Sequence, residues 1–229
     1  MVCDIETVGE DFDSLDKTTQ DVLTDWIRKE SGTEEEYRVA LEELKNRLGF
    51  SPLTAQAVAV GLLDVDGDKG AVYYQNPADK NQESEEGGIK YKAMSEPEML
   101  SKFWELAGKC REVITFNGRS FDVPFLIIRS AVHKIRPSVN LMPPRFASDS
   151  RHIDLLDQLT YYGSVRKKGN LHLWSRVFGI TSPKEQGVKG EDVGRLFKEG
   201  KYLEIAKYNA GDLFATRELY EIWDDYVRF

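Results

Sequence analysis

The longest nearly apolar run of the chain, residues 55–63, restricts its fold more than any other segment. It consists mostly of Ala, Val and Leu, and it is far shorter than the ~20 residues that a membrane-spanning helix needs. This composition is typical of a buried strand, which we expect over 55–64. An acidic turn containing glycine follows, and the apolar segment 71–75 then completes the pattern of a β-hairpin. The chain is therefore expected to fold around a β-sheet that contains this hairpin.

Strand-like and helix-like segments alternate along the rest of the chain. Short apolar runs predict a first strand at 2–5 and later strands at 112–116 and at the start of 153–161. Helical periodicity and capping residues predict helices at 95–109, 121–133, 170–178, 192–198 and 203–226, and a helix also follows the strand in 153–161. The polar stretches 77–88 and 135–150 are expected to be loops. This order predicts an α/β fold with a mixed sheet of about five strands and residue 4 on its central strand.

Residues 10–50 separate the first strand from the hairpin. Two amphipathic helices are predicted within them, at 19–29 and 33–48. The segment holds 12 acidic and 6 basic residues, a net charge of −6. We interpret it as an acidic helical insertion in one domain that spans residues 1–229, because the sequence has no interdomain linker and no internal repeat. The insertion is also a candidate docking surface for a protein partner.

The formal net charge of −8 at first argues against nucleic acid as a partner. However, the residues outside the acidic insertion carry only −2. Residues 129–176 hold 9 basic and 3 acidic residues, a net charge of +6. A local basic stretch matters more for phosphate contact than the global sum does, although an ordinary solvated surface can have the same composition.

The N-terminal residues argue against export. Acids occupy positions 4 and 6, where a secretory signal peptide has a basic and then an apolar stretch. Cys3 and Cys110 lie far apart and form no CxxC motif, so we expect reduced thiols rather than a disulfide or a zinc site. An intracellular, cytoplasmic protein that does not enter a membrane is therefore expected.

Carboxylates occur at three places that the expected fold makes significant. Asp4 and Glu6 alternate along the first strand and so point to the same face, where buried carboxylates are costly unless they are paired or bind a metal. Asp122 begins the helix that follows a later strand. Tyr208 and Asp212 are four residues apart in the last helix and share a face. Taken singly, these segments also fit a solvated edge strand, a helix N-terminal acid and a surface Tyr–Asp pair.

Taken together, the acids indicate a metal site. In parallel sheets, ligands bind beyond the carboxyl ends of the strands, which is where Asp4, Glu6 and Asp122 are expected. Clustered carboxylates repel one another, and this raises their pKa values unless cations bind. Oxygen ligands suit Mg²⁺ or Mn²⁺, and the sequence has no cluster of His or Cys that competes for zinc.

The same segments resemble the three motifs of the DEDD-type 3′–5′ exonucleases. DxE is present at Asp4 and Glu6, NxxxFD at 117–122 and YxxxD at 208–212, in the order of that family. The tyrosine of the last motif is similar to that of the DEDDy subclass. The chain resembles the proofreading domain of family-B DNA polymerases, within a stand-alone family of polymerase-B-like exonucleases. Residues 152–155 and 187–200 extend this resemblance over nearly the whole chain.

The resemblance implies an RNase H-like mixed β-sheet flanked by helices, from which the 10–50 insertion departs. It also implies a 3′–5′ exonuclease that uses two divalent cations, Mg²⁺ or Mn²⁺. Asp4, Glu6 and Asp212 would hold one cation. Asp4 would also hold the second, with Asp122 supporting that site directly or through water. Tyr208 would hold the attacking water.

The substrate implied by the resemblance is single-stranded DNA, shortened from its 3′ end to nucleoside 5′-monophosphates. Backbone groups around Thr7 would meet the terminal 3′-OH. Asn117 would bind the terminal nucleotide by hydrogen bonding and Phe121 by packing, although Phe121 also fits a core position. Contacts to the phosphate backbone are expected from four basic residues, which also fit a basic surface loop: Arg166, Lys167, Lys168 and His172.

Two other functions fit the same residues. An RNA 3′-end trimming enzyme, resembling oligoribonuclease or RNase D, has the same acids, because recognition of the 2′-OH depends on other contacts. A non-catalytic module that binds nucleic acid or protein is allowed by the fold alone, although a pure binder does not need buried, mutually repelling carboxylates. Polymerase activity is excluded, because palm, fingers and thumb domains do not fit within 229 residues.

Overall fold

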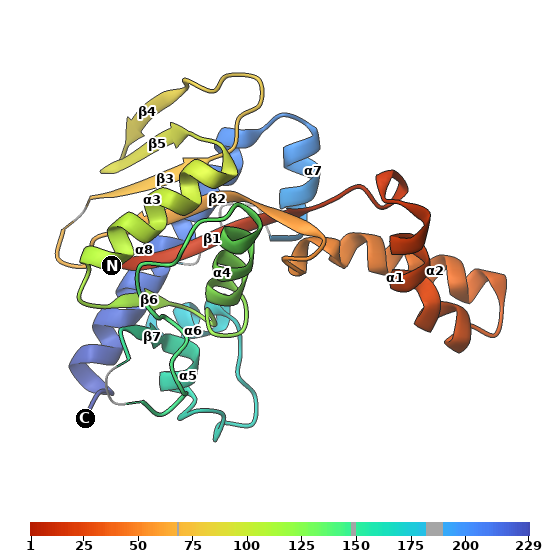
Figure 1. Ribbon diagram of the computed structural model, residues 1–229. Coiled ribbons are helices and arrows are strands. Elements are labelled where there is room, and N and C mark those ends of the chain that lie inside the picture. Colours follow the sequence, from red (N-terminus) through yellow and green to blue (C-terminus); the bar gives the residue numbers. More distant parts are fainter. Residues whose placement is uncertain (68, 148–149, 182–189) are drawn as a thin grey trace.

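A mixed sheet of seven strands forms the centre of the structure, and helices cover both of its faces (Figure 1). The computed structural model describes residues 1–67, 69–147, 150–181 and 190–229. The strands are β1 (Val2–Gly9), β2 (Ala55–Leu63), β3 (Gly70–Tyr74), β4 (Glu83–Glu86), β5 (Ile89–Ala93), β6 (Val113–Thr115) and β7 (His152–Asp154). They lie in the order β4-β5-β3-β2-β1-β6-β7. The predicted α/β class is confirmed.

Strand pairing places β1 in the interior of the sheet. β1 is antiparallel to β2 and parallel to β6, while β2 and β3 form the predicted hairpin. Farther out, β3 and β5 are parallel, β4 and β5 are antiparallel, and β6 and β7 are parallel. The strand that carries Asp4 is therefore next to the middle strand, β2, and is not itself the central strand that the sequence predicted.

The described α-helices agree with the predicted ones to within a few residues. They are α1 (Lys17–Glu30), α2 (Glu34–Arg47), α3 (Glu96–Lys109), α4 (Asp122–Val132), α5 (Leu155–Leu159), α6 (Leu171–Phe178), α7 (Val193–Lys198) and α8 (Tyr202–Tyr226). Short 3₁₀ turns are η1 (Phe12–Ser14), η2 (Leu48–Phe50) and η4 (Gly190–Asp192). Asn170 caps the start of α6, and Gly179 ends that helix in the left-handed conformation.

Two strands were not predicted, and they explain why the sheet is larger than expected. β4 lies in the polar stretch that the composition predicts as a loop, and all of its residues are exposed, so hydrophobic periodicity cannot reveal it. β5 has an apolar–charged alternation in which Ile89, Tyr91 and Ala93 are buried. The two strands pair with each other, and the Lys90 Nζ atom lies 2.5 Å from the Glu83 carboxylate across the ladder.

The sheet has an apolar core on each face, because successive side chains of a strand point to opposite sides. On one face, Val2 and Val8 of β1 pack with residues of α8. On the other face, Cys3 and Ile5 pack with residues of α3 and α4. The carboxylates of β1 alternate with Cys3 and Ile5, so they face α8.

The helices α1 and α2 form a hairpin that projects from the rest of the molecule (Figure 1). As predicted, this helical insertion lies between β1 and β2. Phe12, Ile27 and Leu48 are its buried apolar residues.

Cys3 and Cys110 are free thiols. Over the described residues, no helix combines the length and the apolar character that crossing a membrane requires.

Candidate active site

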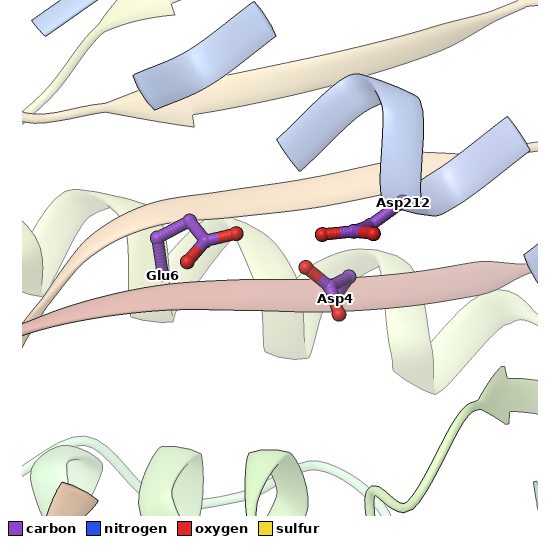
Figure 2. A group of neighbouring side chains, drawn as sticks. All are labelled: Asp4, Glu6 and Asp212. Carbon is purple, nitrogen blue, oxygen red and sulfur yellow. The ribbon is translucent and has the colours of Figure 1, made fainter. Parts of the chain in front are cut away.

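The carboxylates of Asp4 and Glu6, from β1, meet that of Asp212, from α8 (Figure 2). One oxygen of each residue lies within 4.8 Å of the others. The alternation of β1 brings the first two to one face, and α8 lies across that face. Glu6 is only 8% exposed, whereas Asp4 and Asp212 are partly accessible to solvent. Two acids of the first strand and one of the last helix are thus brought together at a site that solvent can reach.

Asp122 lines the same cavity from the first residue of α4. Its carboxylate accepts a hydrogen bond from the backbone N–H of Ile5, at 3.1 Å. This N–H is available because the neighbouring strand β6 is short and ends at Thr115. Asp122 is therefore tied to β1 beside the cluster, although it is outside the group whose oxygens lie within 4.8 Å of one another.

The cluster is electrostatically costly when it carries its full negative charge. Desolvation, followed by the charges of Asp122 and Asp212, raises the pKa of Asp4 well above its ordinary value. Desolvation and then the charge of Asp212 likewise raise the pKa of Glu6. Desolvation also raises the pKa of Asp122 to about 7, against the effect of the Ile5 N–H bond. Such a group of carboxylates is expected to take up protons or cations.

The donor set fits a hard divalent cation. Asp4, Glu6 and Asp212 each offer a carboxylate oxygen, and these atoms are close enough to share one ion. Mg²⁺ and Mn²⁺ prefer oxygen ligands of this kind. Among the described residues, no His or Cys joins the group, so the ligands typical of a structural zinc site are missing there.

Asn209 belongs to the site, although the sequence patterns assign it no role. Its side chain is 0% exposed, and its amide donates a hydrogen bond to Asp4 Oδ2 at 2.7 Å. Its amide oxygen is buried and has no hydrogen-bond partner among the described residues. One signal could have revealed it. Position 209 is four residues from both Ile205 and Leu213, so an amide interrupts the apolar stripe of α8.

Gly61 of β2 makes room for Asn209. A Cβ atom at this position would lie 1.9 Å from Asn209 Oδ1 and 2.7 Å from Leu213 Cδ1. Gly61 is also the residue that pairs with Asp4 in the β1–β2 ladder. The glycine therefore lets α8 approach the sheet at the point where the carboxylates meet.

Replacing Gly61 by alanine is expected to lower the free energy of unfolding by about 1–3 kcal/mol, because the added methyl group overpacks a buried contact. Urea denaturation of both proteins measures this difference. Gly194→Ala is the matched control, since a Cβ there meets nothing within 4 Å. Its stability should stay the same or rise slightly. A Gly61→Ala protein as stable as the wild type would show that α8 tolerates displacement at this point.

Tyr208 lies one helical turn before Asp212 and lines the cavity. Its side chain is 8% exposed. The hydroxyl donates a hydrogen bond to Asp212, and desolvation, followed by the charges of Asp212 and Glu6, raises its pKa. A Cβ at Gly190 would lie 4.0 Å from the hydroxyl oxygen, so η4 begins close to it. Tyr208 therefore presents a protonated hydroxyl beside the carboxylates.

A cavity of about 480 Å³ opens beside the cluster. Besides the acids and Tyr208, its walls include Phe50, Phe116, Asn117, Ser120 and Phe121. Asn117 adopts a left-handed backbone conformation with φ of 63°. Asp154 holds this turn by accepting backbone hydrogen bonds from Asn117 and Arg119, at 2.9 Å each. Phe121 both lines the cavity and packs against the core.

The other predicted substrate contacts are not brought to the cavity wall. Thr7 is not among the described lining residues, and its hydroxyl donates a hydrogen bond to the carbonyl oxygen of Gly49, at 2.6 Å. Four basic residues are also absent from the described lining: Arg166, Lys167 and Lys168 are exposed between α5 and α6, and His172 is in α6. Of the segment 187–200, residues 187–189 lie outside the described part of the chain.

Several cations of the basic stretch 129–176 have internal partners. Arg129 forms an ion pair with the buried Glu96, at 2.7 Å, and Arg145 forms one with Asp157. Arg151 donates to backbone carbonyls, including that of Ala107 at 3.2 Å. The local charge sum therefore overstates how many cations this stretch can offer to phosphates.

A family model described as a predicted 3′-5′ exonuclease related to the exonuclease domain of PolB matches residues 58–223. The match includes Asp122, Tyr208 and Asp212 but begins after the insertion. Asp4 and Glu6 are therefore outside it, and the structure places them beside Asp212.

A solved family B DNA polymerase, from the hyperthermophilic archaeon Pyrobaculum calidifontis, is similar in structure, with a TM-score of 0.60 and 14% sequence identity. The similarity covers 97% of this chain and 24% of the polymerase chain. It shows a shared fold and agrees with the expected RNase H-like arrangement. Among curated proteins, no match is found.

Proposed function

The chain belongs to the family of predicted 3′-5′ exonucleases related to the exonuclease domain of PolB, and we propose that it is a metal-dependent 3′–5′ exonuclease. The proposed substrate is single-stranded DNA, which it hydrolyses from the 3′ end to nucleoside 5′-monophosphates. The observation that carries the proposal is the meeting of Asp4, Glu6 and Asp212 within 4.8 Å, at a cavity that Asp122 and Tyr208 also line.

Each residue of the cluster has a proposed part in the reaction. Two divalent cations, held by Asp4, Glu6 and Asp212 with support from Asp122, would supply activation of a water and neutralisation of the leaving 3′ oxygen. The Tyr208 hydroxyl orients the attacking water, and Asn209 holds the carboxylate of Asp4 in place through its 2.7 Å hydrogen bond. Phosphodiester hydrolysis of this kind depends more on positioning and charge stabilisation than on covalent chemistry.

The lining of the cavity supports the proposal of a single-stranded substrate. Its walls combine apolar rings with the Asn117 side chain, which suits a nucleotide that has been separated from its neighbours. A blunt duplex must first unpair its last bases, which costs a few kcal/mol. We therefore expect single-stranded DNA to be cut faster than the same sequence in a blunt duplex.

The test uses DNA and RNA strands of one sequence, each labelled at the 5′ end, and the corresponding blunt DNA duplex. The expected result is a descending ladder of single-nucleotide steps, which forms fastest on single-stranded DNA. Immediate release of the labelled 5′ nucleotide without a ladder would show the opposite polarity. A ladder that forms mainly on RNA would replace DNA by RNA as the substrate.

A further inference from the structure

The end of the helical insertion forms part of the cavity wall. Phe50, the last residue of η2, lines the cavity together with the acids. Its side chain is 61% exposed, so a large apolar ring faces solvent beside the acids. The rings of Phe50 and Phe121 lie edge to face, with centroids 6.3 Å apart. The Phe50 ring is thus in contact with one other ring, while most of its surface remains open.

The backbone that carries this ring is firmly held. Leu48, two residues earlier, is buried, and its carbonyl oxygen accepts a hydrogen bond from the Thr54 hydroxyl, at 2.8 Å. The carbonyl oxygen of Gly49 accepts one from the Thr7 hydroxyl of β1, at 2.6 Å. A Cβ at Gly9 would lie 2.7 Å from the Gly49 nitrogen, so the turn sits directly against β1. Phe50 is therefore an exposed ring on a turn anchored to the strand that carries Asp4.

We propose that Phe50 is a stacking surface for the 3′-terminal base of the substrate, an inference that rests on the proposed exonuclease function. A ligand of this cavity has to offer a phosphate to the carboxylate cluster through cations and a flat apolar group to the open ring. A nucleotide has both. The cavity volume of about 480 Å³ lies in the range of roughly 300–1,000 Å³ that is usual for small-molecule sites.

This placement gives the insertion a role in the reaction. The segment that begins after β1 and forms the projecting hairpin returns to the sheet at η2, and there it completes the wall of the cavity. The Thr7 hydroxyl has a supporting role, because it fixes the turn that presents Phe50. Stacking on an aromatic ring tolerates all four bases, since every base has a π-face, so Phe50 would contribute affinity without sequence preference.

The test compares Phe50→Ala, Phe50→Trp and the wild type on two single strands, one with a normal 3′ end and one with an abasic sugar as its last residue. Removal of the ring should lower kcat/KM on the normal strand by about 5- to 100-fold, the scale of one base–aromatic stack. The same variant should match the wild type on the abasic strand, because no base is present to stack. Phe50→Trp should retain activity on the normal strand.

Leu53→Ala is the matched control. Leu53 is 79% exposed and lies three residues after Phe50, but it is not among the described residues that line the cavity. Its kcat/KM should equal that of the wild type. Equal loss by Phe50→Ala on both strands, or no loss on either, would overturn the stacking role while the exonuclease assignment stands. If the wild type cleaves neither strand, the proposed function itself is refuted.

Discussion

Asp4→Asn is expected to abolish cleavage, with a rate reduced by more than about 1,000-fold. Single groups that stabilise transition-state charge contribute about 100- to 1,000-fold, and the proposed mechanism assigns Asp4 to both cations. Asparagine keeps the size of the side chain and an oxygen that can accept the hydrogen bond from Asn209. The measurement is the initial rate of cleavage of single-stranded DNA. The control is Asp66→Asn, which alters an exposed acid and should retain full activity.

The same substitution is expected to stabilise the metal-free protein. The pKa of Asp4 is raised in the folded state by desolvation and by the charges of Asp122 and Asp212. A group whose pKa is raised on folding stabilises the protein at pH values below its ordinary pKa. This stability is lost as the pH rises through the pKa of the folded state. For Asp122 that window extends to a pKa of about 7. In chelator, the wild type should therefore melt at a lower temperature at pH 8 than at pH 5, and Asp4→Asn should reduce this difference.

Tyr208→Phe is expected to lower turnover by roughly 10- to 1,000-fold, the scale of a single positioning group. The change removes only the hydroxyl, which hydrogen-bonds to Asp212 and lies beside the carboxylates. The buried ring and its packing remain, so the melting temperature should change little. Single-turnover rates with saturating enzyme measure the effect on the chemical step.

Tyr220→Phe is the matched control for this substitution. Tyr220 is another tyrosine of α8 with 8% exposure, but it is not among the described residues that line the cavity. The Tyr220→Phe protein should cleave single-stranded DNA at the wild-type rate. A Tyr208→Phe protein of full activity would mean that Tyr208 has only a packing role, and the proposed positioning of the attacking water would fail even if the four acids are required.

The acids were visible in the sequence because their spacing follows local periodicity. Asp4 and Glu6 share a face through the two-residue repeat of a strand, and Tyr208 and Asp212 share one through the four-residue repeat of a helix. The structure brings Asp4, Glu6 and Asp212 together, with Tyr208 at the same cavity. These relations depend on secondary structure and on the order of the elements.

The remaining parts of the site depend on tertiary contacts that spacing does not encode. Gly61 and Asn209 meet only because α8 lies across β2, and Phe50 reaches the cavity only because the insertion returns to β1. Strand β4 was not predicted, because it too depends on a tertiary contact. Its exposed residues are held by pairing with β5 and not by an apolar pattern. The charge of residues 129–176 also overstates the number of cations available for phosphate contact, because Arg129 and Arg145 form ion pairs within the protein.

Metal dependence of cleavage by the unaltered protein tests the central claim most directly. The assay follows a 5′-labelled DNA strand with the protein in excess EDTA and again after Mg²⁺ or Mn²⁺ has been added beyond the chelator. Clustered carboxylates need divalent charge to admit a phosphate, so we predict no cleavage in EDTA and a descending ladder after either metal is restored. Undiminished cleavage in excess chelator would contradict the assignment of Asp4, Glu6 and Asp212 as the metal site.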